Sequence, residues 1–191
     1  MEMEHPLILA SQSPRRREYL SLLQQPYTCI SPQVDETLPL HLPAYACVMQ
    51  LAQRKAEAVA RDAQMHALCI GADTVVVHGG RILGKPRDEA DAFAMLSALQ
   101  NDVHTVYTGV CICEAGTMRK ACSYRSTQVQ FASMTSQEIR AYIATGEPMD
   151  KAGAYGIQGF GAAYIAGICG CYYNVVGLPI SLVRTLLAQW A

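Results

Sequence analysis

The sequence predicts an α/β fold in which a mixed β-sheet is flanked by helices. Segments with strand character alternate with segments of helical period along the 191 residues, as is typical of α/β proteins. Hairpin-like pairs of strands interrupt this alternation, which favours a mixed sheet over a purely parallel one. The length and the 51% hydrophobic content suit one domain over residues 1–191 with one sizeable core.

The first half of the chain begins with a short buried strand at residues 6–10. Ser13 is a suitable N-cap and Pro14 suits the first helical position, so a helix is expected from there to about Gln24. A loop rich in proline and acidic residues extends to Pro43. The other elements expected in this half are a strand at 27–31, a helix over 44–63, a strand at 67–77 and a hairpin turn at 78–81.

The second half contains an uncharged, glycine-rich segment at residues 152–183. Its length would suffice to cross a bilayer, but its seven glycines disfavour a continuous helix. We therefore expect strands and loops of a soluble core there, and no membrane partner. The other elements expected in this half are a helix at 88–99, strands at 103–114 and 120–132 that meet near Gly116, a helix from the capping box of Thr135 and Glu138 to Gly146, and a last helix from Pro179 to near Trp190.

Composition excludes several classes of protein. Only 16% of the residues are charged, against roughly 25% in an average soluble domain, and so few charges with so much apolar content exclude disorder. The net charge of −1 argues against a nucleic-acid partner bound through many phosphates. The eight cysteines show no zinc spacing, and the first residues lack the features of a secretory leader. We therefore expect reduced core thiols and a cytoplasmic location.

Several charged residues break the local pattern. Lys55 lies within the apolar stripe of its helix, so its ammonium either reaches past the edge of the core or meets an anion. Asp73 interrupts an apolar strand, which is costly unless the carboxylate is paired, protonated or metal-bound. Alternatively, Asp73 ends the strand and bonds to the backbone. Asp35 and Glu36 form another acidic pair in a loop, where charges are ordinarily solvated.

Residues with hydroxyl and guanidinium groups are concentrated at the junction between the first expected strand and the first expected helix. Free amides at a helix N-terminus suit a phosphate, although a merely solvated basic turn is the alternative. A polyphosphate site needs cations together with acids that hold metal or activate water. On residues alone, the interpretation stops at a phosphate-ester enzyme or an anion-binding module. The residues concerned are Ser11, Ser13, Arg15 and Arg16 at the junction, with Lys55, Lys85, Asp73 and Glu36 elsewhere.

Six motifs then carry a family resemblance over nearly the whole chain. They are LILASQSPRR at 7–16, LAQRKA at 51–56, GADTVV at 71–76, ILGKPRD at 82–88, DKAGAYGIQG at 150–159 and NVVGLP at 174–179. In this order they resemble the Maf family of nucleoside triphosphate pyrophosphatases, once described as inhibitors of septum formation. The segment AGAYGIQG resembles the branch that acts on dTTP and UTP.

The resemblance implies an activity and an architecture. The activity is hydrolysis of a nucleoside triphosphate to the monophosphate and pyrophosphate, a house-cleaning role in the nucleotide pool, with a divalent metal cation such as Mg²⁺ or Mn²⁺. The architecture is an elongated mixed sheet with two lobes around a central cleft, often in a homodimer. The alternatives are a non-catalytic nucleotide-binding regulator of cell division and a phosphatase that releases orthophosphate. The set of acids and cations favours catalysis over mere binding.

The resemblance also implies roles for individual residues. Asp73 matches the proton acceptor, and its carboxylate with that of Glu36 would hold the metal. Gln158 matches a position linked to base selectivity, and its amide offers the donor and the acceptor that O4 and N3–H of a pyrimidine require. Alternatively, Gln158 only orders its glycine-rich loop. The other assignments are Lys55 and Lys85 as catalytic cations, Ser11, Ser13, Arg15 and Arg16 as phosphate-binding residues, and Arg15 and Thr74 as further selectivity residues.

Overall fold

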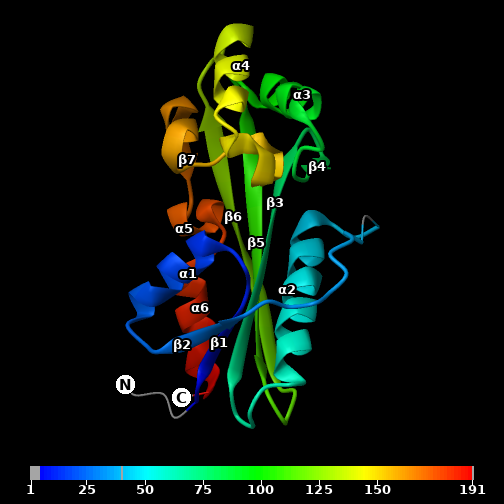
Figure 1. Cartoon of the computed structure of the whole chain (residues 1–191), viewed down its shortest axis with the longest axis vertical. Helices are drawn as coiled ribbons and strands as arrows, with labels where there is room; N and C mark the ends of the chain where they lie inside the picture. The colour runs from blue at the N-terminus through cyan, green and yellow to red at the C-terminus, as the bar shows by residue number, and fades with distance from the viewer. Residues whose placement is uncertain (1–4, 40, 191) are drawn as a thin grey trace. The chain divides into compact units, whose positions relative to one another are not determined.

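A mixed seven-stranded sheet forms across the described residues, 5–39 and 41–190, of a computed structural model (Figure 1). This confirms the predicted α/β class. The strand order is β2-β1-β3-β5-β6-β7, and β4 pairs separately with β3. The strands are β1 (Leu7–Ala10), β2 (Tyr27–Ile30), β3 (Leu68–His78), β4 (Arg81–Leu83), β5 (Val103–Glu114), β6 (Lys120–Phe131) and β7 (Ile165–Cys169).

Apart from their ends, the helices follow the sequence prediction, except that the short helix at Tyr172–Val176 was not predicted. The first helix stops at Leu20 and continues as a 3₁₀ turn to Leu23, because Gln24 takes a left-handed conformation with φ of 54°. The helices are α1 (Pro14–Leu20), α2 (Ala44–Ala60), α3 (Glu89–Leu99), α4 (Ser136–Ala144), α5 (Tyr172–Val176) and α6 (Ile180–Leu187), with 3₁₀ turns at Ser21–Leu23, Glu147–Asp150, Ala152–Ala154, Gly159–Tyr164 and Ala188–Trp190.

The glycine-rich segment at 152–183 corrects the sequence prediction. It contains β7, but before the predicted last helix it also holds 3₁₀ turns and helix α5, so the expectation of strands and loops there is wrong. Glycine prevents one long helix without preventing single helical turns, which need few consecutive residues. Within residues 5–39 and 41–190, no helix combines the length and the apolar character needed to span a bilayer.

The chain divides into two compact structural units. One comprises residues 1–73, 108–125 and 177–191, and the other comprises residues 74–107 and 126–176. Because the boundaries fall inside β3, β5 and β6, neither unit is a continuous stretch of sequence. One domain over residues 1–191 therefore stays a prediction, and residues 1–4, 40 and 191 lie outside the described part of the chain.

In the first unit, helices cover both faces of the strands. Leu7 and Leu9 of β1 join the apolar cluster that contains the buried side chains of α6, whereas Ile8 and Ala10 join the cluster beneath α2. Successive strand residues point to opposite faces, so a strand buried on both sides is apolar throughout, as β1 is. Accordingly, α2 lies along one side of these strands and α6 along the other (Figure 1).

Two glycines let α2 pack unusually close to the sheet. A Cβ atom at Gly71 of β3 would lie 2.1 Å from the carbonyl oxygen of Ala52, and one at Gly109 of β5 would lie 2.4 Å from that of Val48. Both distances are far below any tolerable contact, so the helix backbone rests directly on the strands. Glycine inside a strand often marks such an approach of another backbone.

In the second unit, α3 and α4 pack with Val106, Val129 and Phe131 in one apolar cluster. The predicted hairpin is confirmed, because β4 pairs antiparallel with the end of β3. Its two turn residues, Gly79 and Gly80, both have positive φ, as a type I′ turn requires. The predicted capping box of α4 is also present, with Thr135 and Glu138 bonded reciprocally.

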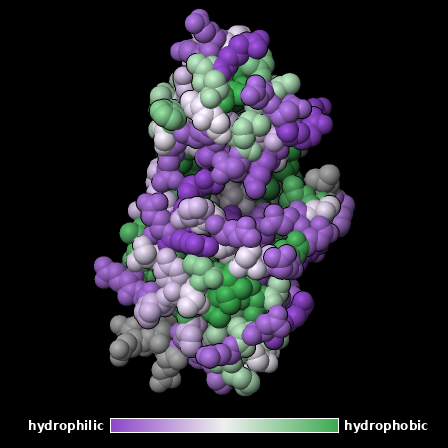
Figure 2. Space-filling model, viewed as in Figure 1, coloured by the Kyte–Doolittle hydropathy of each residue, from purple (hydrophilic) through white to green (hydrophobic). Residues whose placement is uncertain are grey.

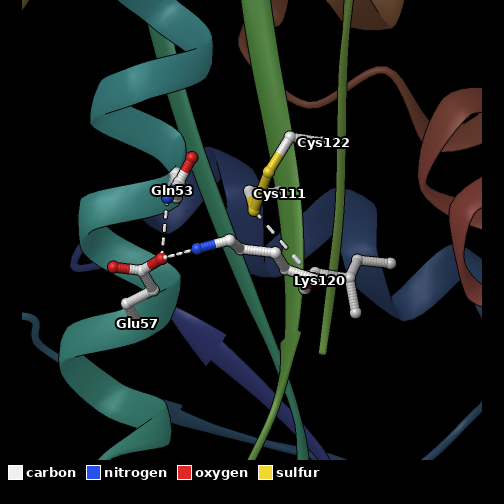
Figure 3. The surroundings of a disulfide bond; sticks show 6 residues. Gln53, Glu57, Cys111, Lys120 and Cys122 are labelled. Atoms are coloured by element: carbon white, nitrogen blue, oxygen red, sulfur yellow. Dashed lines mark hydrogen bonds and ion pairs between the residues drawn. A yellow bond between two sulfur atoms is a disulfide. The ribbon is translucent and has the colours of Figure 1, made fainter. Parts of the chain in front are cut away.

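The expectation that all cysteines are reduced is wrong for one pair. Cys111 of β5 and Cys122 of β6 form a disulfide, and their Cα atoms lie 4.1 Å apart (Figure 3). The two strands are neighbours in the sheet, and directly opposite residues of such strands come close enough to pair. The two cysteines lie 11 positions apart in the sequence, and no local pattern predicts that they pair. The other six cysteines are free.

An ion pair lies beside the disulfide. The ammonium of Lys120 is 2.5 Å from Oε1 of Glu57 (Figure 3). The same oxygen accepts a hydrogen bond of 2.7 Å from the side-chain amide of Gln53. Burial raises the pKa of Glu57, but the bonds from Lys120 and Gln53 outweigh it and the net pKa is lowered. The pair links α2 to β6.

The surface mixes polar and apolar side chains. Figure 2 shows hydrophilic residues over much of the face in view, with hydrophobic patches between them. Large exposed hydrophobic side chains include Leu22, Met65 and Phe160. Scattered apolar residues of this kind are ordinary on soluble proteins.

The close packing at Gly71 leads to a testable prediction. We expect Gly71→Ala to destabilise the protein by about 2 kcal/mol, because the new methyl group must push α2 away from β3. Urea unfolding followed by circular dichroism measures the change. The matched control is Gly167→Ala in β7, where an added Cβ would meet nothing within 4 Å. Equal stability of the two variants would contradict the packing argument.

Candidate active site

A buried lysine between two carboxylates forms the centre of the candidate site. The ammonium of Lys55 lies 2.7 Å from Oδ1 of Asp73 and 2.8 Å from Oε1 of Glu36. The Lys55 side chain is only 7% exposed and that of Asp73 14%, whereas the Glu36 side chain is 61% exposed. Lys55 therefore meets anions, as one of the two sequence interpretations predicted, and these anions belong to the protein itself.

The packing of α2 on β3 explains why these groups meet. Lys55 lies between Ala52 and Ala56, whose backbone atoms are those that approach Gly71 most closely. Asp73 follows Gly71 by two residues, so its side chain leaves β3 on the same face. The strand continues to His78, which excludes the alternative that Asp73 ends it.

The junction between β1 and α1 adjoins the same part of β3. Ala10, the last residue of β1, is in register with Gly71 in the parallel pair of β1 and β3, so the chain leaves β1 beside Gly71. Ser11 is buried, and its hydroxyl accepts a hydrogen bond of 3.1 Å from the amide of Ser13. Ser13 is the N-cap of α1, as the sequence predicted.

Two arginines extend from the first turn of α1. The Nε atom of Arg16 donates to the carbonyl of Gly177 over 2.8 Å, which ties α1 to the segment before α6. Burial has the largest effect on the pKa of Arg16 and lowers it. The negative charge of Asp73 raises this pKa, the positive charge of Arg15 lowers it, and the charge of Glu36 has the smallest, raising effect. The charges of Asp73, Glu36 and Arg15 thus all act on the Arg16 guanidinium. The unit presents cations and acids together, as polyphosphate chemistry requires.

Glu36 and Asp73 suit a magnesium ion that is shared with a phosphate ligand. Both carboxylates contact the same ammonium, so their oxygens are near one another. Among residues 5–39 and 41–190, no group of three or more His, Cys, Asp or Glu side chains could hold a metal by itself. Magnesium, however, is usually held by one or two carboxylates together with substrate phosphates, and this donor set matches that requirement.

The other predicted site residues belong to the second unit. Thr74 follows Asp73 in β3, Lys85 is exposed after β4, and Gln158 is half-buried just before a 3₁₀ turn. The carbonyl of Gly84, next to Lys85, accepts a hydrogen bond of 3.0 Å from the amide of Gly153. The roles assigned to these three residues, and the predicted cleft between two lobes, stay predictions.

Sequence reasoning missed the residues that make the site possible. Gly71 and Gly109 were not singled out, although an isolated glycine within a strand pattern is a signal for close backbone approach. The bond from Arg16 to Gly177 joins residues 161 positions apart, and no local pattern could reveal it.

Comparison with known proteins independently supports the family resemblance of the sequence motifs. The family described as "Maf-like protein" matches residues 6–190. A relative from Moorella thermoacetica, named dTTP/UTP pyrophosphatase, is 52% identical over 95% of this chain and 93% of its own length. Relatives with the same name from Pelotomaculum thermopropionicum and Salinibacter ruber are 49% and 47% identical, over 96% and 100% of this chain and 96% and 94% of their own lengths.

A solved structure shows the same kind of fold at low sequence identity. The Ham1 protein of Staphylococcus aureus matches with a TM-score of 0.51 and 13% identity, covering 97% of this chain and 100% of that one. This likeness concerns the arrangement of helices and strands alone.

Proposed function

The chain belongs to the family of Maf-like proteins, as its motifs predicted, and we propose that it hydrolyses dTTP and UTP to the nucleoside monophosphate and pyrophosphate. The observation that carries this proposal is the buried contact of Lys55 with Asp73 and Glu36. This contact brings a cation and two carboxylates together, which supports both a base and a metal site there. Relatives about half identical over almost their whole length bear the name of this activity.

In the proposed reaction, Asp73 acts as a general base. Its carboxylate takes a proton from water, and the water oxygen bonds to the α-phosphorus of the nucleotide. The bond from that phosphorus to the bridging oxygen breaks, and pyrophosphate leaves with the bond electrons. Lys55, Arg15 and Arg16 neutralise the charge that develops on the leaving group, and the electrostatic part of catalysis depends on such positioned cations. Ser11 and Ser13 bind phosphate oxygens, and Lys85 adds a further cation.

A divalent cation, Mg²⁺ or Mn²⁺, is part of this proposal. Glu36 and Asp73 would hold it, as their shared contact with Lys55 suits two neighbouring carboxylate ligands. The bound cation would withdraw charge from the phosphate oxygens. The chain's own contribution is to keep these two carboxylates together and to hold Lys55 beside them.

Gln158 is proposed to select the base. Its amide both donates and accepts, so it suits the O4 acceptor and the N3–H donor of thymine and uracil. Arg15 and Thr74 are proposed as further selectivity residues on the family resemblance. That resemblance also supports a homodimer with a house-cleaning role. The six free thiols favour a cytoplasmic location, whereas the Cys111–Cys122 disulfide does not. Neither nucleic acid nor a membrane is proposed as a partner. No observation favours a non-catalytic regulator of cell division.

The first test identifies the products and the base together. We expect the purified protein with dTTP and Mg²⁺ to release dTMP and pyrophosphate, and Asp73→Asn to lower kcat by about 100-fold or more, the usual contribution of a general base. Chromatographic separation of nucleotides with a pyrophosphate assay measures both.

The matched control is Asp62→Asn, which changes an exposed carboxylate just after α2 and should leave kcat unchanged. Release of dTDP and orthophosphate by the unaltered protein would instead indicate a phosphatase. Unchanged dTTP would indicate a binding protein, and near-normal turnover by Asp73→Asn would exclude the carboxylate as the base.

A second test concerns base choice. We expect Gln158→Glu to lower kcat/KM for UTP relative to CTP by about tenfold, because a carboxylate cannot donate to O4 of uracil and leaves that acceptor unpaired. Competition between the two nucleotides in one reaction measures the ratio. Gln137→Glu, an exposed residue of α4, is the control for added charge. An unchanged ratio in Gln158→Glu would refute the role in base selection.

A further inference from the structure

Glu147 binds the backbone of the loop that carries Gln158. Its Oε2 accepts a hydrogen bond of 2.8 Å from the amide of Phe160, and its Oε1 accepts one of 3.0 Å from the amide of Gly161. Tyr142 also donates its hydroxyl to Oε1, over 2.8 Å. Hydrogen bonds to an ionised carboxylate are stronger than those between neutral groups. The carboxylate therefore holds the loop just after Gln158.

Tyr142 extends the same network to the other side of Gln158. Its hydroxyl oxygen accepts a hydrogen bond of 3.1 Å from the amide of Gly156. The Tyr142 side chain comes from α4 and is buried, so its position is set by the core of the unit. Backbone amides both before and after Gln158 are thus tied to one tyrosine–glutamate pair.

The loop after Gln158 packs directly against Glu147 and Tyr142. A Cβ atom at Gly159 would lie 2.4 Å from Oε2 of Glu147, and one at Gly161 would lie 2.6 Å from the Tyr142 hydroxyl. Gly159 also has φ of 69°, which glycine adopts without strain. The glycines on either side of Phe160 let the chain wrap directly around the carboxylate.

Glu147 is itself anchored and charged. Its amide donates to the hydroxyl of Thr145 over 3.2 Å, and its carbonyl accepts from the ammonium of Lys151 over 2.6 Å. Burial raises the pKa of Glu147, but the amides of Phe160 and Gly161 outweigh it and the net pKa is lowered. The carboxylate therefore stays ionised at neutral pH, when its bonds to the loop are strongest.

We propose that Glu147, supported by Tyr142, is a positioning residue that orients Gln158 toward the nucleotide base. The inference rests on the proposed function, in which Gln158 selects thymine and uracil. Glu147 does not touch the base in this scheme. It fixes the backbone on both sides of Gln158. The side-chain amide of Gln158 can therefore bind the base without the loss of conformational entropy that ordering a mobile loop would require.

The test is Glu147→Gln, assayed with dTTP, UTP and CTP. A glutamine keeps the size of the side chain, but its NH₂ group would face one of the two backbone amides that the carboxylate accepts from. We expect KM for dTTP to rise by about tenfold with little change in kcat, and the preference for UTP over CTP to fall by a similar factor. Amide hydrogen exchange at residues 156–161 should become faster.

Two further variants separate positioning from general stability. Tyr142→Phe removes the hydroxyl that joins Gly156 to Glu147. We expect KM and selectivity to change in the same direction as in Glu147→Gln, but by a smaller factor. Glu138→Gln alters another carboxylate that binds a backbone amide, that of Thr135 in the capping box of α4, and should leave the preference for UTP over CTP unchanged. If Glu147→Gln does not fold, Tyr142→Phe decides by the same criteria.

Each outcome decides between the alternatives. Faster exchange in the loop with unchanged KM and selectivity would overturn the inference, because the loop would then move without consequence for the base. An equal loss of kcat for all nucleotides, matched by Glu138→Gln, would assign Glu147 a structural role only and would also overturn it. Failure of the unaltered protein to release dTMP and pyrophosphate would instead refute the proposed function, which the positioning role requires.

Discussion

The direct contact of the α2 backbone with the sheet is the constraint on which the first unit depends. Gly71 and Gly109 lie under Ala52 and Val48, where no side chain fits. A helix on a sheet is ordinarily separated from it by a layer of side chains. Removing that layer here brings the next turn of α2 down to β3, and Lys55 therefore reaches Asp73 although its side chain remains within the apolar stripe.

The ion pair at the centre of the site contributes little to stability by itself. Taking an ammonium and a carboxylate out of water costs about as much as their attraction returns, and an apolar pair of similar volume often does as well. Its presence is explained better by chemistry than by folding. The same holds for the basic first turn of α1, since Arg15 and Arg16 oppose the helix dipole there. Both features favour an anionic ligand.

Patterns in the sequence predicted most of the fold and marked several members of the site. Lys55 and Asp73 stood out because each breaks an apolar run, and the capping residues Ser13 and Thr135 marked helix starts within one residue. Apart from helix α5 and the two strand glycines, the features that remained undetected depend on contacts between residues 11 or more positions apart. The disulfide joins neighbouring strands, and Glu147 meets amides 13 and 14 positions later. Local periodicity carries no information about such pairs.

The first unit also constrains how the protein is made. Leu7 and Leu9 of β1 belong to the same apolar cluster as Leu182 and Leu186 of α6. During synthesis the chain leaves the ribosome from its N-terminus, and α6, which covers β1, emerges long after that strand. This core therefore closes only once α6 has emerged. Until then, the nascent chain exposes an apolar strand surface that holding chaperones would be suited to shield.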